Sequence, residues 1–170
     1  MVNKTNSVWN ASWINSVLLR YTENFTAAAG AWVQHGAIAN NVAADSKLCS
    51  ATREDFGEAA AAVLSSDYKG DVNVALELAG DEPYTMTDLA RIASEVSGKP
   101  IKHHLVQEAE FSGMLQSFGF PKVASDTLAD AHTGISNGAL AENGNKTLSK
   151  LIGRKTTPLI DTVKAALAGK

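Results

Sequence analysis

The sequence predicts an α/β fold in which short parallel strands alternate with helices and helices dominate the C-terminal half. Two patterns carry this prediction. Residues 16–20 form a short, nearly unbroken apolar run, as expected of a strand covered on both faces, and further strands are predicted at residues 74–80 and 101–106. Helix-start signals, followed by apolar residues at helical spacing, lie between and after these segments.

The composition fits one globular domain and excludes several other classes of protein. Of the 170 residues, 45% are hydrophobic and 19% are charged, which is not the composition of a disordered chain. The net charge of −3 argues against a nucleic acid or an anionic membrane as the main partner. The single cysteine, Cys49, excludes an internal disulfide and a multi-cysteine metal site. Since no secretory signal and no bilayer-length apolar run is present, we expect a cytoplasmic protein.

The first half of the chain is interpreted as strand, helix, loop and strand. The apolar run at residues 16–20 leads into a helix over residues 21–35, which Gly36 ends. Residues 37–46 are rich in Ala, Asn and Asp and are expected to form a loop. Residues 47–52 follow as a short strand.

Two helices carry a capping-box signature, in which a hydroxyl residue precedes an acidic residue by three positions. Thr52 and Asp55 open one helix, and its apolar residues follow at helical spacing. Thr85 and Asp88 open another, which Gly98 ends. These two helices are the clearest local predictions in the sequence.

The C-terminal part is expected to contain one strand followed by four helices. A helix with Phe111, Met114, Leu115 and Phe118 on one face follows the strand at residues 101–106. The remaining helices are expected at residues 123–132, 147–152 and 158–168.

Several common catalytic motifs are missing from the sequence. It contains no GxGxxG and no GxxxxGK[ST], so no turn can be assigned to a pyrophosphate. It also lacks HExxH and the Tyr-x-x-x-Lys pair of common short-chain dehydrogenases. His103 and His104 are neighbours in a strand and point to opposite faces, and Cys49 has no adjacent histidine, so we interpret all three as structural.

Two polar clusters follow predicted strands. Open α/β sheets bind ligands at the carboxyl ends of their strands, and residues 20–24, Arg-Tyr-Thr-Glu-Asn, lie at such an end. Residues 52–55, Thr-Arg-Glu-Asp, lie at a second strand-to-helix junction. Each cluster can also be explained by helix capping and a surface ion pair alone, so both interpretations stay open.

Four segments together resemble the C-terminal portion of NmrA-like proteins, which are atypical members of the short-chain dehydrogenase/reductase superfamily. They are LLRYTENF, SATREDFGEAAAAVL, ELAGDEPYTMTDLARIASEVSGKPI and KTLSKLIGRKTTPL. The resemblance covers most of residues 16–167 in order and is strongest to the NAD(P)H:quinone oxidoreductases of the family. It implies a Rossmann-type fold with a helical substrate lobe over the strand ends, with residues 1–15 matching poorly and residues 16–170 forming the C-terminal region.

The resemblance also implies a function for particular residues. Arg20, Tyr21 and Asn24 match the family segment that lines the substrate cleft, and Arg53 matches the second junction. The family binds NADP and transfers hydride to a quinone-like substrate. The glycine-rich turn that holds the dinucleotide in the family is missing, as is an Asn-Gly-Trp-like insert between Arg20 and Tyr21.

We therefore expect that the complete protein is an NADPH-dependent quinone oxidoreductase and that this chain alone is weakly active or inactive. The alternatives are a non-catalytic NmrA-like redox-sensing module and a truncated remnant. A homo-oligomer is also possible, since removing neighbouring strands from a parallel sheet exposes its edges.

Overall fold

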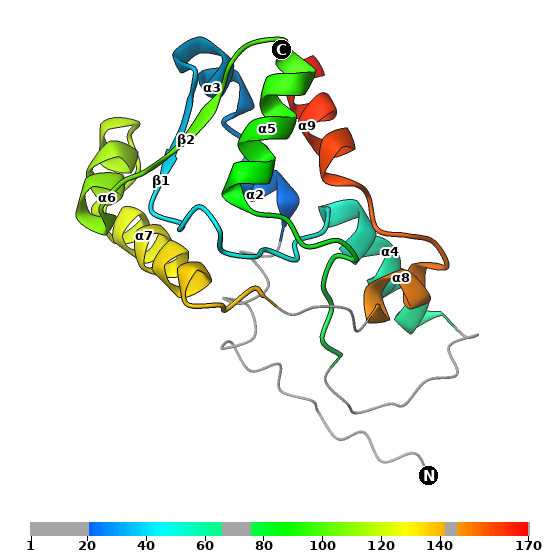
Figure 1. Cartoon of the computed structure of the whole chain (residues 1–170). Coiled ribbons are helices and arrows are strands. Elements are labelled where there is room, and N and C mark those ends of the chain that lie inside the picture. The colour runs from blue at the N-terminus through cyan, green and yellow to red at the C-terminus, as the bar shows by residue number, and fades with distance from the viewer. Residues whose placement is uncertain (1–20, 66–75, 142–145, 170) are drawn as a thin grey trace.

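The computed structural model describes residues 21–65, 76–141 and 146–169 of the chain. Helices surround one short sheet (Figure 1). In chain order the elements are α2 (Thr22–Thr26), α3 (Ala29–His35), β1 (Ala37–Asn40), α4 (Arg53–Leu64), α5 (Met86–Ser97), β2 (Lys102–Leu105), α6 (Glu108–Ser117), α7 (Lys122–Ser136), α8 (Thr147–Ile152) and α9 (Leu159–Ala168).

The sheet confirms the predicted α/β class with parallel strands. β1 pairs with β2 in parallel, with Ala37 opposite Lys102 and Asn40 opposite Leu105. The expectation that residues 37–46 form only a loop is wrong for residues 37–40. Ala and Asn have low strand propensity, and here the pairing with β2 and the burial of alternate residues impose the extended backbone.

Two other predicted strands are irregular. Residues 47–52 make only isolated bridges, Leu48 with Tyr84 and Ala51 with Tyr21, and the described residues of the run at 74–80 form no strand. The backbone at Gly80 instead lies very close to the segment at Cys49, and the Gly80 N–H donates to the Cys49 carbonyl at 2.9 Å. The predicted strand at residues 16–20 lies outside the described residues.

The helix boundaries follow the predicted signals closely. Both capping boxes are formed, at Thr52 with Asp55 and at Thr85 with Asp88. Gly36, Gly98 and Gly153 each follow a helix in the left-handed conformation, with φ of 67° to 69°. The helix expected over residues 21–35 is divided into α2 and α3. Phe118 lies just beyond the end of α6 and is 73% exposed, so the stripe predicted there is buried at Phe111 but not along its whole length.

Two apolar clusters hold the elements together. The larger cluster joins α2, α3, α5, α7 and α9 around β1, and α5 and α9 lie side by side in Figure 1. Its fully buried side chains include Val42, Leu48, Met86, Leu89, Ile135 and Val163. The smaller cluster packs α8 against α4 through Ala51, Ala59 and Leu148. The N-termini of α2 and α4 lie next to each other because the segments that precede them form a backbone bridge at Tyr21 and Ala51.

Candidate functional site

The junction of α2 and α4 is built on backbone contacts between two segments that precede helices. Tyr21, the N-cap of α2, forms a parallel bridge with Ala51, and the Thr22 N–H donates to the Ala51 carbonyl at 2.9 Å. Thr52 then caps α4, so that Arg53 is its first residue. The two polar clusters of the sequence, which are about thirty positions apart, therefore lie at one place in the fold.

Three of the four predicted substrate-binding residues contact one another at this junction. The Arg53 guanidinium lies over the Tyr21 ring, 5.4 Å from its centroid. The same guanidinium donates from Nη2 to Asn24 Oδ1 at 3.1 Å. The fourth residue, Arg20, lies outside the described residues. Because Arg53 and Asn24 are both exposed, the cluster presents an aromatic ring, a cation and an amide to solvent.

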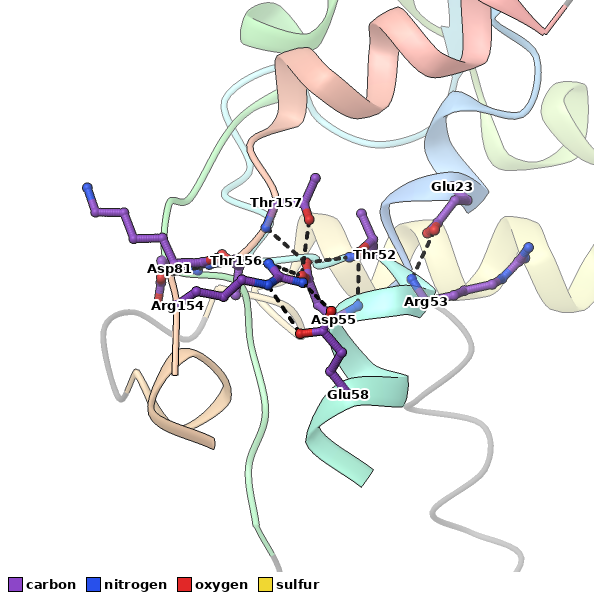
Figure 2. A network of polar contacts seen from close by, with 10 residues as sticks. Glu23, Thr52, Arg53, Asp55, Glu58, Asp81, Arg154, Thr156 and Thr157 are labelled. Carbon is purple, nitrogen blue, oxygen red and sulfur yellow. Dashed lines mark hydrogen bonds and ion pairs between the residues drawn. The ribbon is translucent and has the colours of Figure 1, made fainter. Parts of the chain in front are cut away.

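Glu23 fixes the position of Arg53, although the sequence motifs did not single it out. Its Oε1 accepts from the Arg53 N–H at 2.9 Å, which satisfies one of the backbone donors that a helix N-terminus leaves unpaired (Figure 2). Phe56 packs edge-on against the Tyr21 ring, with 5.5 Å between centroids. The ring and the guanidinium are therefore held from both helices. The only sequence signal for the Glu23 contact is its place in the first turn of α2.

Asp55 connects the start of α4 to a segment 102 positions later, as Figure 2 shows. The side chain is fully buried. It accepts from the Thr157 N–H at 2.9 Å, from the Thr157 hydroxyl at 3.0 Å and from the Arg154 guanidinium at 2.8 Å. It also accepts from the Thr52 N–H at 3.3 Å, which completes the capping box.

The charge of Asp55 is structural. Burial by itself raises the pKa of this carboxyl, but the hydrogen bonds from Thr157, Thr52 and Arg154 outweigh burial and hold the pKa below its ordinary value. Asp55 therefore stays ionised at neutral pH and does not act as a proton donor. Arg154 also binds Glu58 through two nitrogens, at 2.9 and 3.1 Å, so one cation serves two carboxylates of α4.

His103, Cys49 and Met86 lie among hydrogen-bonding or apolar neighbours. His103 shares a hydrogen bond of 3.1 Å with Asn40 Oδ1, while His104 is exposed on the other face of β2. Burial and the neighbouring His104 lower the pKa of His103. Cys49 and Met86 are buried. Among the described residues, no group of three or more His, Cys, Asp or Glu side chains could hold a metal ion.

The N-termini of α4 and α5 do not offer unpaired N–H groups to the pyrophosphate of a dinucleotide. A helix N-terminus binds phosphate through unpaired N–H groups, but those of α4 and α5 are closed by their capping boxes, each with an aspartate in the first turn. The first turns of α6 and α9 also carry acidic residues. What the α2–α4 junction does offer is one ring face for stacking and the N–H donors of Arg53 for a carbonyl oxygen. Within the described ranges, no helix is both long and apolar enough to cross a membrane.

Comparison with known proteins finds quinone oxidoreductases that are more than 40% identical to this chain. Quinone oxidoreductase 2 of Escherichia coli (strain K12) is 43% identical over 144 residues, which are 84% of this chain and 49% of the relative. The crystal structure of an NADPH-dependent quinone oxidoreductase from Escherichia coli, complexed with NADPH, is 41% identical with a TM-score of 0.79. The match covers 86% of this chain and 50% of the oxidoreductase. No protein-family model matches the sequence.

A second enzyme has the same fold at lower identity. The triphenylmethane reductase of a Citrobacter species is 36% identical with a TM-score of 0.79, over 87% of this chain and 50% of the reductase. The chain thus spans about half the length of each relative, and its match to the quinone oxidoreductase lies in the C-terminal region of that protein.

Proposed function

Because this chain is homologous over 144 residues to an NmrA-like quinone oxidoreductase, an atypical short-chain dehydrogenase/reductase, we propose that it is the substrate-binding part of an NADPH-dependent quinone reductase. In the complete protein, hydride passes from NADPH to a quinone-like substrate. The observation that carries the proposal is the contact of Arg53 with both Tyr21 and Asn24.

The proposed roles follow from the chemistry of a quinone, which is flat, aromatic and acceptor-rich. The Tyr21 ring and the Arg53 guanidinium offer a planar surface for stacking. The remaining Arg53 N–H groups and the Asn24 amide donate to a quinone oxygen. The assignment of Arg20 to the same site rests on the resemblance alone and stays a prediction. Glu23 acts as a positioning residue, since it holds the backbone of Arg53.

The proposal assigns NADPH to residues other than the described ones, because the helix N-termini of α4 and α5 are already capped by their own side chains. The printed sequence contains no glycine-rich dinucleotide turn. We therefore expect the 170-residue chain, assayed alone, to bind NADPH weakly and to reduce quinones slowly or not at all.

The test is a titration of the chain with menadione, followed by quenching of intrinsic fluorescence. We expect saturable binding that Arg53→Ala weakens about fivefold, since it removes the stacked cation and its hydrogen bond. Arg53→Lys keeps the charge but loses the planar fork, and should fall between the two. Arg91→Ala removes an exposed arginine from α5 and serves as the matched control.

The outcomes separate the proposal from its alternatives. Equal affinities of the Arg53→Ala and Arg91→Ala variants would contradict a quinone site at the α2–α4 junction. Tight NADPH binding without quinone binding or turnover would favour the redox-sensing module. Rapid NADPH oxidation by the chain alone would contradict the expectation that it is weakly active.

A further inference from the structure

A separate cleft lies between α2, α5 and residues 155–160, with a cavity volume of about 280 Å³. It shares no lining residue with the contacts of Arg53. Its floor carries the hydroxyl groups of Thr22, Ser50 and Tyr84, and its walls include the apolar side chains of Ile92 and Leu159. Nothing proposed above uses this cleft.

The three hydroxyl groups form a chain of hydrogen bonds. Thr22 Oγ1 lies 2.9 Å from Ser50 Oγ, which lies 2.7 Å from the Tyr84 hydroxyl. The three residues are 3%, 7% and 6% exposed, so bulk water does not compete with these bonds. Burial raises the pKa of Tyr84, and the phenol therefore keeps its proton at neutral pH.

These three hydrogen-bonded hydroxyls together have one more donor than their mutual hydrogen bonds use. Each hydroxyl carries one proton, and the two hydrogen bonds use only two of the three. Depending on the donor directions, the surplus proton sits on Thr22, on Tyr84, or on Ser50 when that hydroxyl accepts from both neighbours. No acceptor for it is found among the described residues. A buried donor without an acceptor is costly, so this O–H requires an acceptor atom in the cleft.

The same cleft also contains an acceptor without a donor. Asp81 lines it and is joined to Thr156 by two hydrogen bonds, one from each backbone N–H to the side chain of the other residue, at 2.9 and 3.1 Å. Only the bond from the Thr156 N–H uses the carboxylate, and it uses Oδ2. Its Oδ1 is buried and has no hydrogen-bond partner among the described residues.

We propose that this cleft binds a small neutral molecule, about one aromatic ring in size, that carries a carbonyl oxygen and a hydroxyl group. The carbonyl oxygen accepts the surplus proton of the hydroxyl chain, and the hydroxyl donates to Asp81 Oδ1. The cavity is at the lower end of the size of small-molecule sites, which fits a single ring between Ile92 and Leu159.

The charges around the cleft favour a neutral ligand. Asp81, Glu82 and Asp88 face it together with Arg91 and Lys155, so negative side chains outnumber positive ones. Arg91 is already paired, with Asp88 at 3.5 Å and Glu95 at 3.9 Å. An anion would therefore meet repulsion from the carboxylates without gaining an uncommitted arginine.

The probe for this site is para-hydroxyacetophenone, titrated into the full chain and followed by amide chemical shifts. We expect saturable shifts centred on residues 50, 81, 84 and 156. Acetophenone, which lacks the hydroxyl, and para-hydroxybenzoate, which is an anion, should each bind at least fivefold more weakly. Tighter binding of the benzoate would overturn the assignment of a neutral ligand.

Variants locate the ligand in the cleft. Because the surplus proton is on one of the three hydroxyls, at least one of Tyr84→Phe, Thr22→Val and Ser50→Ala should weaken binding fivefold or more. Ile92→Trp, which fills the cavity, should abolish binding. Thr127→Val removes an exposed hydroxyl that bonds only within α7 and is the matched control. Affinities unchanged in all of the cleft variants, or no saturable shift with any probe, would overturn the proposal.

The measurement is independent of the reductase assignment. It needs neither NADPH nor quinone turnover, and the Arg53→Ala variant should bind para-hydroxyacetophenone as the unmodified chain does. Failure of menadione binding at the α2–α4 junction and failure of ligand binding in the cleft are therefore distinct results.

Discussion

Asp55 shows how much one side chain can organise in this protein. The carboxylate caps its own helix through Thr52 and at the same time holds the Thr157 backbone and the Arg154 guanidinium. It is inaccessible to solvent, so all these bonds form in an environment where losing a partner is expensive. The N-terminus of α4 and the segment leading to α9 are thereby joined.

Removing this carboxylate should destabilise the fold strongly. Asp55→Ala leaves the Thr52 and Thr157 N–H groups without their acceptor and deprives Arg154 of one of its two carboxylates. We expect the free energy of unfolding, measured with urea, to fall by about 3 kcal/mol.

Glu58→Ala is the matched control, because it removes the other carboxylate bound to Arg154. That carboxylate is 42% exposed, so its loss should cost less than about 1 kcal/mol. Equal losses for the two variants would contradict the assignment of Asp55 as the buried centre of the network.

At the residue scale, short-range relations are predictable and long-range ones are not. The three-position spacing of Thr52 and Asp55 is a local geometric rule and was predicted correctly. The partners Thr157 and Arg154 depend on the path of a hundred intervening residues and carry no local signal. That Tyr21, Asn24 and Arg53 meet at one junction agrees with the sites chosen by resemblance, and their role in binding substrate stays a prediction.

The described segment before α5, residues 76–85, is positioned by a close backbone approach rather than by a regular sheet. Gly80 lies against residues 49–50, and a Cβ atom there would collide with the Ser50 carbonyl oxygen. The backbone bond from Gly80 to Cys49 requires this approach. A glycine at this position therefore keeps the floor of the cleft in place.

Gly80→Ala should consequently destabilise the protein by about 2 kcal/mol, since the colliding atoms belong to the backbone and cannot rotate away. Gly57→Ala is the control, because it lies within α4 with open space around it and should stabilise by about 0.5–1 kcal/mol. Chemical denaturation of both variants checks this. Stabilisation by both substitutions would mean that the chain does not pass so closely at Gly80.

At the element scale, helices were predictable because their ends are marked by residue type. Residues 147–152 form a helix with the predicted bounds, ended by a left-handed Gly153. β1 was missed because Ile38 is the one β-branched residue of Ala37–Asn40, too weak a signal for a strand. Its extended backbone depends on its pairing with β2. The strand expected at residues 47–52 reduces to single bridges because a neighbouring segment contacts it at separate points only.

On the scale of the whole molecule, His132 connects three helices. It belongs to α7, is 7% exposed, and stacks between Phe25 of α2 and Phe111 of α6 at centroid distances of 6.1 and 4.8 Å. Burial lowers the pKa of His132 to about 4. The imidazole is therefore neutral in the folded protein over most of the pH range.

This burial predicts acid sensitivity with a definite window. In the unfolded state His132 takes up a proton near its ordinary pKa of about 6.5, whereas in the folded state it is protonated only near pH 4. Stability should fall as the pH drops through this window, by about 2 kcal/mol from this residue between pH 7.5 and pH 5. Asp55 adds to the loss only below its ordinary pKa of 3.8.

The check is urea unfolding of the wild type and His132→Phe at both pH values. The variant keeps an aromatic ring between Phe25 and Phe111 but cannot be protonated. We expect its stability to change by about 2 kcal/mol less than that of the wild type between the two pH values. Parallel pH dependences would contradict a buried neutral His132.

The order in which this fold can assemble during synthesis follows from the position of α9. This helix packs on α2, α3 and α5, which come from both halves of the chain, and Val163 on it is fully buried in the larger apolar cluster. A nascent chain that has released everything up to residue 150 still lacks that wall of its core. The helices with strong local signals can form as they emerge, but cooperative folding has to wait until α9 has left the ribosome. A chain stopped shortly before α9 would present its unfinished core to chaperones and proteases.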